Sequence, residues 1–179
     1  MREKKKEEEK EKSYYKEKGE EREIQREDRR KSQMSKRDRD KIQNRWPAAE
    51  KFIVENNLNE VFGPERALLG IVVQGGMYNG VVRALQRLGL ADIYGNSDVP
   101  LYVLNVTYPL VKDEFDQFCQ GKEHVLVVEE GQPDFIEQQL GSFLYKSRSS
   151  VELHGKGMLP MAGEYTGQVL LDGVTAFLK

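Results

Sequence analysis

A glycine-rich turn, Gly75-Gly76-Met77-Tyr78-Asn79-Gly80, is the first candidate for chemistry in this sequence, because it links an apolar run to a helix-like pattern. In dinucleotide-binding folds such a turn carries a pyrophosphate, and its glycines let the backbone approach the phosphates. Here Met77 occupies the second required glycine position, and Asn105 stands where an acidic ribose ligand would follow the next strand. The sequence also lacks a GxxxxGK[ST] phosphate loop, so neither class of nucleotide site is predicted.

Metal and nucleophilic chemistry have few candidate residues. The two histidines, His124 and His154, are far apart in sequence and have no ligand-like partners at short spacing, so we expect no metal site. Cys119 is the single cysteine, which excludes an internal disulfide and any multi-thiolate zinc or iron–sulfur site in this chain. Because no Ser/His/Asp or Cys/His constellation can be assembled, we expect no catalytic residue.

Two short polar motifs have a functional and a structural interpretation. Glu129-Glu130 resembles an acid–base pair, but adjacent residues at the end of a strand point to opposite sides of the sheet. His154-Gly155-Lys156-Gly157 is either an anion-binding loop or a plain turn. The residues of these motifs do not decide between the two.

The apolar pattern predicts the elements that position these motifs. Leu69 to Gln74 form a run without polar alternation, as is typical of a parallel strand covered on both faces. A helical spacing follows, and the same strand-then-helix order repeats along the chain. We predict strands at 69–74, 101–106, 125–128 and 151–153, and helices at 77–88, 111–119, 134–145 and 164–178. The predicted fold class is α/β, a three-layer sandwich with a mostly parallel sheet.

The crevice outside the carboxyl ends of the strands is the usual ligand site of such a fold. The residues that we predict to gather there are Gly75, Gly76, Tyr78, Tyr108, Glu129 and Glu130. The competing interpretation is structural: the glycines form turns, Tyr108-Pro109 stops a strand, and the glutamates are solvated charges.

The first part of the chain has a different composition. Residues 1–41 are mostly Lys, Glu and Arg, and they make the first quarter of the chain net positive within an overall formal charge of -2. Such a segment buries too little surface to offset its ordering entropy, so we predict a disordered segment or a single exposed helix. Acidic residues are threaded through it, which favours a solvated charged surface over a nucleic-acid arm.

Residues 42–65 are predicted to be a docking helix and linker, and residues 66–179 the α/β domain. Trp46, Ala49, Phe52 and Ile53 form one apolar stripe on the helix, and residues 58–65, with Gly63 and Pro64, are predicted to form a loop. No apolar run approaches the roughly 18 residues of a membrane span, and the charged start has no signal-peptide core. We therefore expect a cytoplasmic protein without a membrane partner.

An ordered set of short motifs resembles the indolepyruvate ferredoxin oxidoreductases, in the part between their two thiamine-diphosphate-binding domains. The resemblance covers about Lys41 to Lys179. Its motifs are Trp46–Ala49, Leu58–Glu60, Gly70–Val72 with Gly75 and Tyr78, Tyr108–Leu110, Val127–Glu130, Phe135–Gln139, His154–Lys156, Leu159-Pro160 and Gly163-Glu164.

That resemblance implies a domain similar to the C-terminal domain of transketolase. Enzymes of the family oxidatively decarboxylate aryl 2-oxo acids to acyl-coenzyme A with thiamine diphosphate, magnesium and iron–sulfur clusters, and they pass electrons to ferredoxin. The resemblance places the thiamine ligands and cluster cysteines in other domains, so no cofactor is expected in this chain and no catalytic residue is carried over. The charged start replaces a folded domain, which suggests a fragment, a split gene product or an aberrant reading frame.

Two functions follow as expectations. The first is a non-catalytic structural domain that works with the other domains or subunits of the oxidoreductase, and with ferredoxin as partner of the assembled enzyme. The second is a free-standing α/β module that binds a small ligand or a protein without catalysis.

Overall fold

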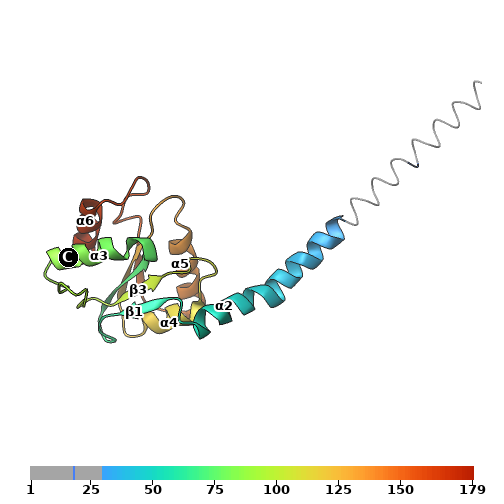
Figure 1. Ribbon diagram of the computed structural model, residues 1–179, viewed down its shortest axis with the longest axis horizontal. Helices are drawn as coiled ribbons and strands as arrows, with labels where there is room; N and C mark the ends of the chain where they lie inside the picture. The colour runs from blue at the N-terminus through green and yellow to red at the C-terminus, as the bar shows by residue number, and fades with distance from the viewer. Residues whose placement is uncertain (1–17, 19–29) are drawn as a thin grey trace, which may run out of the picture. The chain divides into compact units, whose positions relative to one another are not determined.

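The computed structural model describes residue 18 and residues 30–179, which divide into two units at Ala48 and Ala49 (Figure 1). In the first unit, residues 30–40 are helical and exposed, and they are followed by η1 (Lys41–Arg45). The boundary between the units falls within α2 (Trp46–Glu55). The Lys41 ammonium lies 5.8 Å from the centre of the Trp46 ring. Residues 1–41 were predicted to be either disordered or a single exposed helix. The described stretch from residue 30 is helical, and residues 1–17 and 19–29 lie outside the described residues.

The second unit is built on a five-stranded sheet in the order β1-β3-β2-β4-β5. Four strands are parallel: β2 (Leu69–Gln74), β3 (Leu101–Leu104), β4 (His124–Val128) and β5 (Glu152–His154). The remaining strand, β1 (Glu60–Phe62), pairs antiparallel with β3. A short 3-10 turn, η2 (Gly75–Met77), joins β2 to α3 (Tyr78–Arg87).

Helices cover both faces of this sheet, as Figure 1 shows. α3 and α6 (Gly167–Phe177) pack together on one face, and α4 (Lys112–Cys119) and α5 (Phe135–Ser147) pack together on the other. The predicted three-layer α/β sandwich with a mostly parallel sheet is confirmed.

Successive strand residues alternate between two separate cores, which explains why the strands are apolar on both faces. Ile71 and Val73 face α3 and α6, whereas Val72 between them faces α4 and α5. All three side chains are fully buried. Leu126 and Val127 of β4 divide between the two cores in the same way. Burial of this kind is worth about 1.5–3 kcal/mol per aliphatic side chain, so the sheet is fixed from both sides.

Three expectations from the sequence are corrected by the structure. The predicted loop at 58–65 contains β1, whose three residues complete the sheet edge beside β3. The predicted strand 101–106 ends at Leu104, because the Asn105 amide donates to the Leu58 carbonyl (2.9 Å) and the Val106 N–H donates to the Asn59 side chain (3.1 Å). The apolar stripe on α2 is only partly buried: Ile53 is enclosed, but Phe52 is 59% exposed.

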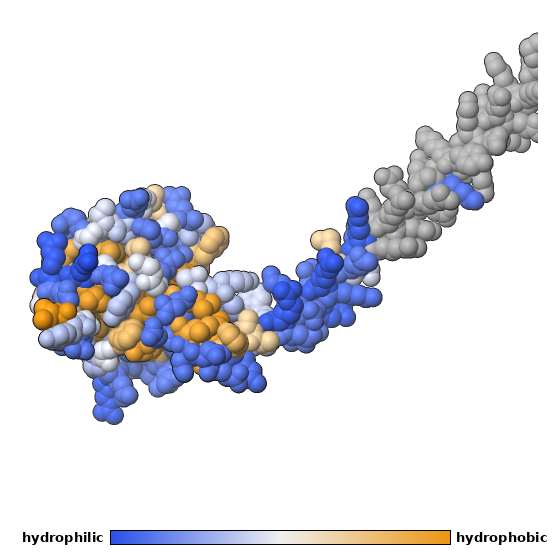
Figure 2. All heavy atoms as spheres, viewed as in Figure 1, coloured by the Kyte–Doolittle hydropathy of each residue, from blue (hydrophilic) through white to orange (hydrophobic). Residues whose placement is uncertain are grey.

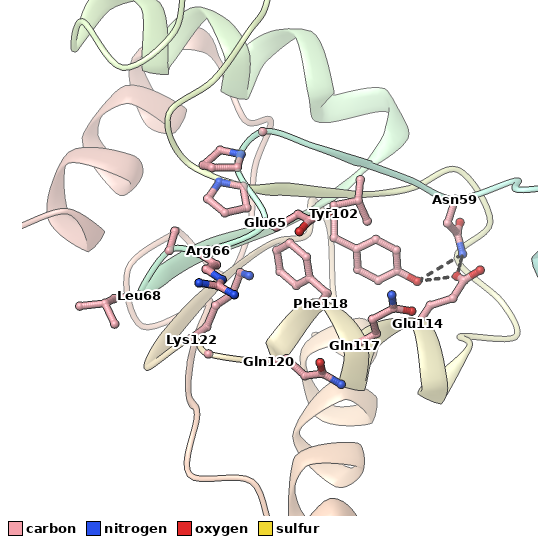
Figure 3. A pocket seen from close by; sticks show the side chains of 16 residues that line it. Asn59, Glu65, Arg66, Leu68, Tyr102, Glu114, Gln117, Phe118, Gln120 and Lys122 are labelled. Atoms are coloured by element: carbon pink, nitrogen blue, oxygen red, sulfur yellow. Dashed lines mark hydrogen bonds between the residues drawn. The ribbon is translucent and has the colours of Figure 1, made fainter.

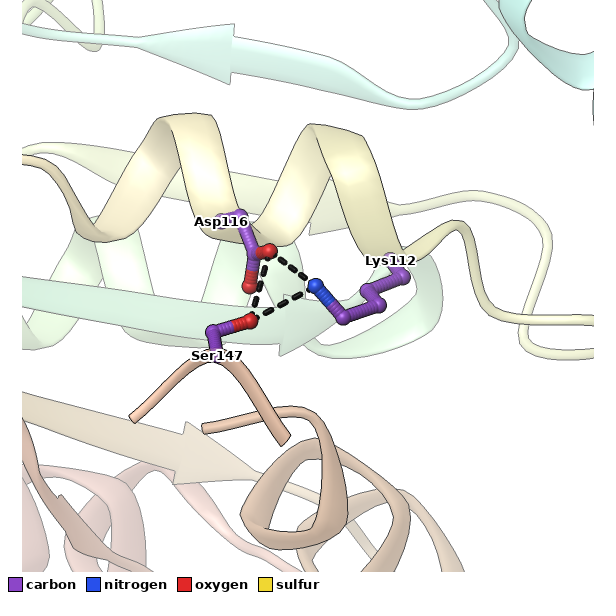
Figure 4. A network of polar contacts seen from close by, with 3 residues as sticks. All are labelled: Lys112, Asp116 and Ser147. Carbon is purple, nitrogen blue, oxygen red and sulfur yellow. Dashed lines mark hydrogen bonds and ion pairs between the residues drawn. The ribbon is translucent and has the colours of Figure 1, made fainter. Parts of the chain in front are cut away.

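A small polar network ties α4 to α5 on the outer surface (Figure 4). The Lys112 ammonium donates to the Ser147 hydroxyl (2.6 Å) and also pairs with Asp116 one turn along its own helix. The Ser147 hydroxyl in turn donates to the Asp116 carboxylate (2.8 Å). These three side chains are partly exposed and satisfy one another, so we assign them to helix packing.

Among residue 18 and residues 30–179, no helix is both long enough and apolar enough to cross a membrane.

Candidate functional site

The carboxyl ends of β2, β3 and β4 border a cavity of about 760 Å³, where ligands of α/β folds commonly bind. Gln74 ends β2, Thr107 and Tyr108 follow β3, and Glu129 follows β4. The opposite wall is the start of α5, with Phe135, Ile136, Gln138, Gln139 and Ser142. Of the six residues predicted to form a crevice, Tyr108 and Glu129 therefore line one cavity.

The Glu129 carboxylate is committed to the first turn of α5. It accepts hydrogen bonds from the backbone N–H of Ile136 (3.0 and 3.1 Å to its two oxygens) and of Glu137 (3.2 Å). These N–H groups have no partner within the helix, and the positive end of the helix dipole favours a negative charge there. Because Glu129 is also only 5% exposed, its carboxylate acts as a buried helix cap.

The neighbouring Glu130 points to the other side of the sheet, as expected for adjacent residues at a strand end. One of its carboxylate oxygens accepts from the Tyr165 backbone N–H (2.5 Å) near the start of α6. Its own N–H donates to the Gln74 side chain (2.9 Å). The two glutamates therefore hold the two helical layers and do not face a common substrate position.

Lys156 closes the same end of the sheet. Its ammonium donates to the carbonyls of Glu129 (2.5 Å) and Gly131 (2.8 Å) and to the Tyr165 hydroxyl (2.9 Å). With its donors engaged in this way, the motif from His154 to Gly157 acts as a structural turn, which was one of its two interpretations.

The other predicted crevice residues lie outside this cavity lining. Gly75 packs against Asn105, whose Oδ1 would be 2.6 Å from an added Cβ, whereas an added Cβ at Gly76 would meet open space. The Tyr78 ring packs 5.4 Å from that of Phe62 in β1. The two glycines thus belong to the β2–α3 turn, and Tyr78 belongs to the packing of the α3 layer.

A second cavity, of about 1050 Å³, runs along β1 and α4 and was not found by sequence reasoning (Figure 3). At one end the Tyr102 hydroxyl (2.8 Å) and the Asn59 amide (2.9 Å) donate to Glu114. Burial and this carboxylate raise the pKa of Tyr102 above its usual value, so it stays a protonated donor. Sequence reasoning missed this cavity because Asn59 lies in the stretch 58–65, which was predicted to be a loop.

Arg66 and Lys122 lie at the other end of this second cavity, and Phe118 stands between the two ends (Figure 3). Lys122 is 8% exposed, its ammonium lies 4.6 Å from the centre of the Phe118 ring, and burial lowers its pKa. The cavity therefore presents a basic end, an aromatic wall and a carboxylate end, which suits a polar molecule better than an apolar one.

The two histidines lie side by side, although 30 positions separate them in the chain. His124 Nδ1 is 3.1 Å from His154 Nε2, and the Glu152 carboxylate lies next to both rings. The expectation of no metal site assumed that sequence distance keeps these residues apart, and the pairing of β4 with β5 removes that assumption.

A family profile described as the indolepyruvate oxidoreductase domain matches residues 59–176, which include all five strands of the sheet. The chain belongs to this family. Its curated relatives include the indolepyruvate oxidoreductase subunit IorA of Methanothermobacter thermautotrophicus, 35% identical over 124 residues that cover 68% of this chain. The IorA subunit of Pyrococcus horikoshii is 33% identical over 132 residues that cover 72% of this chain.

These segments cover 19% of each relative, so the chain spans about a fifth of the length of the curated relatives it matches. Among solved structures, the 2-oxoglutarate:ferredoxin oxidoreductase of Magnetococcus marinus matches 68% of this chain and 20% of its own, with a TM-score of 0.47 and 21% identity. A split-gene transketolase, described as an inactive β4 tetramer, matches 67% of this chain and 41% of its own, with a TM-score of 0.49 and 15% identity.

The residues that the structure describes do not fit the iron–sulfur clusters or the magnesium ion that the family resemblance implies. An iron–sulfur cluster needs several thiolates, whereas Cys119 is the single cysteine of the sequence. Its side chain is buried in α4, and this burial raises the pKa of the thiol to about 12. In the part of the chain that the structure describes, the acidic side chains at the strand ends hold helix termini instead of an open magnesium and diphosphate site.

Proposed function

We propose that this chain is a non-catalytic structural domain of a thiamine-diphosphate-dependent indolepyruvate ferredoxin oxidoreductase, which oxidatively decarboxylates aryl 2-oxo acids to acyl-coenzyme A. Thiamine diphosphate, magnesium and iron–sulfur clusters are bound by other domains or subunits of that enzyme, and ferredoxin takes the electrons. The family match over residues 59–176, together with its share of one fifth of the IorA subunits, supports this assignment.

The observation that carries the non-catalytic part is the position of Glu129. Among the described residues it is the one buried carboxylate, and it stands at the strand ends where a general acid or base would act. The start of α5 occupies both of its oxygens. In the same part of the chain, every buried side-chain nitrogen or oxygen has a hydrogen-bond partner.

A docking role is supported by the apolar side chains exposed around β1. Val61 is 60% exposed on this edge strand, and Figure 2 shows further hydrophobic atoms on the surface of the α/β unit. The exposed apolar residues of β1 and of the segments that flank it in the chain are Phe52, Val54, Val61, Phe62 and Leu68. We define these five residues as the β1-edge patch. Exposed apolar groups of this kind commonly mark protein interfaces, and the other parts of the oxidoreductase are the proposed partner.

The test is complementation of a relative from which the corresponding segment has been removed. The M. thermautotrophicus IorA subunit lacking its matching segment would be mixed with this chain and assayed with indolepyruvate, coenzyme A, thiamine diphosphate, magnesium and ferredoxin. We expect no turnover and no calorimetric binding of thiamine diphosphate by the chain alone, and binding of the folded chain to the truncated subunit. Turnover by the chain alone would overturn the non-catalytic assignment, and absence of binding to the truncated subunit would overturn the docking assignment.

A matched pair of variants separates docking from folding. Val61→Lys places a charge in the β1-edge patch, whereas Ile93→Lys places one on the exposed loop before β3, where the side chain is 84% exposed. We expect Val61→Lys to weaken the complex and Ile93→Lys to leave it unchanged. Equal weakening by both variants would count against the β1-edge patch as the docking surface.

A second candidate function is ligand binding by a free-standing α/β module. The cavity of about 760 Å³ at the strand ends favours it, because Gln138, Gln139 and Ser142 give it a polar wall. Ligand binding at the crevice predicted from Gly75, Gly76, Tyr78, Tyr108, Glu129 and Glu130 is therefore part of this second proposal. Indolepyruvate and coenzyme A are the probes: a rise in melting temperature that Ser142→Leu abolishes would support this function, and no rise would oppose it.

A further inference from the structure

The edge of the sheet formed by β4 and β5 carries three side chains that are typical metal ligands. His124 lies directly opposite Glu152 in the register of these parallel strands, and His154 lies opposite Leu126. Side chains two positions apart share one face of a strand. The two imidazoles and the carboxylate are therefore on the same face, at the first residue of β4 and along β5, and none of them lines the strand-end cavity.

The distances between the ligand atoms match those of a coordinated ion. His124 Nδ1 and His154 Nε2 are 3.1 Å apart, and Glu152 oxygens lie 3.5 Å from the first atom and 3.8 Å from the second. In a tetrahedral zinc site, with bonds of about 2.0–2.1 Å, two ligand atoms are separated by about 3.3 Å. Small side-chain movements therefore suffice to place one ion within reach of all three residues.

The surroundings hold one ligand firmly and leave the others accessible. The His154 ring packs 5.7 Å from Phe177 of α6 and is mostly buried, while the His124 and Glu152 side chains are substantially exposed. Among the described residues, the ion pairs recorded for Glu152 are both with these imidazoles, so no lysine or arginine pair competes for its charge. An ion can thus enter from solvent and keep a position for water.

The chemistry of the three ligands selects the class of metal. In the metal-free chain, one proton between the two ring nitrogens satisfies a single hydrogen bond, since one nitrogen must donate and the other accept. An ion that replaces this proton meets two neutral imidazoles and one carboxylate. Nitrogen-rich sets of this kind suit Zn²⁺ and Co²⁺, whereas Mg²⁺ and Ca²⁺ prefer oxygen ligands.

We propose that His124, Glu152 and His154 form a binding site for a borderline divalent transition metal ion, with Zn²⁺ as its natural occupant. The site joins the edge strand β5 to β4 and fixes the edge of the sheet opposite β1. It is separate from the strand-end cavity, whose lining contains none of these three residues.

The sequence makes the test unusually direct, because His124 and His154 are its only histidines. The full chain, purified without a histidine tag, would be titrated with Zn²⁺ by calorimetry and with Co²⁺ by visible absorption. We expect one ion per chain, a Co²⁺ spectrum of low coordination number, and a shift of both imidazole signals in the NMR spectrum. Binding that leaves both imidazole signals unmoved, or no binding of either ion below millimolar concentration, would overturn the proposal.

Variants with matched controls complete the test. His154→Gln and Glu152→Gln should each weaken Zn²⁺ binding by at least tenfold, with folding checked by circular dichroism in the absence of metal. Glu164→Gln is the control for a lost surface carboxylate, and Cys119→Ser is the control for the buried thiol; neither should change the affinity. Affinity that survives in His154→Gln, or that falls equally in Glu164→Gln, would show that the ion binds elsewhere.

Discussion

Replacement of Glu129 by alanine is the sharpest test of the structural role assigned to this residue. The change removes the carboxylate that accepts from Ile136 and Glu137 at the start of α5. A hydrogen bond to a charged group contributes about 1.5–3 kcal/mol, and a buried N–H without a partner costs about 1–3 kcal/mol. The Glu137 N–H is only partly buried, so water can replace one of the two lost bonds. We therefore expect the free energy of unfolding to fall by about 2–4 kcal/mol.

The assay is urea denaturation of the full chain, followed by far-ultraviolet circular dichroism. Glu129→Gln keeps one acceptor oxygen but loses the charge, so it should cost about 1–2 kcal/mol. Glu164→Ala removes an exposed carboxylate and should change the free energy of unfolding by less than about 0.5 kcal/mol. If Glu129→Ala unfolds within about 0.5 kcal/mol of the parent chain, the carboxylate does not hold α5 and stands free for chemistry.

Three further predictions test the packing at other places in the α/β unit. Gly75→Ala should lower the free energy of unfolding by about 1–2 kcal/mol in urea denaturation, because its Cβ would displace Asn105. The added Cβ of Gly76→Ala meets open space, so this variant should be neutral or slightly stabilising. Equal effects of the two variants would refute the close contact between Gly75 and Asn105. Cys119, whose pKa is raised to about 12 by burial, should resist iodoacetamide at pH 8 until urea unfolds the chain, and rapid native alkylation would contradict that burial. Ser147→Ala should cost about 0.5–1.5 kcal/mol by the same denaturation assay, and no loss would show that the network between α4 and α5 is dispensable.

The sheet and its helices were predictable because their signals are local and periodic. Leu69 to Gln74 were predicted with the bounds that β2 has, since a strand buried on both faces must be apolar throughout. β1 was missed because it has three residues and lies between Asn59 and Gly63-Pro64, which favour a loop. Its strand conformation comes from antiparallel pairing with β3, a contact between residues about 40 positions apart that no local pattern reveals.

The polar residues of the candidate sites show the same division between local and distant causes. The opposite directions of Glu129 and Glu130 followed from strand geometry alone. The hydrogen-bond partner of Glu129 could not be predicted in this way. It is the backbone N–H of Ile136, which lies at the start of α5. The meeting of His124 with His154 likewise depends on the alignment of two strands across the whole of α5, and their spacing in the chain gave no sign of it.

The two borders of the sheet differ in character, and this difference limits how the molecule can assemble. β1 ends the sheet with exposed apolar side chains, whereas β5 ends it with the Glu152 carboxylate and the His154 imidazole. Unpaired strand edges invite pairing with other chains, and contacts between unlike surfaces that fit each other can repeat without limit. Here the apolar border finds no match in the charged one. This difference in side chains disfavours a head-to-tail contact between β1 of one copy and β5 of the next, which is the contact that growth into a fibre would need.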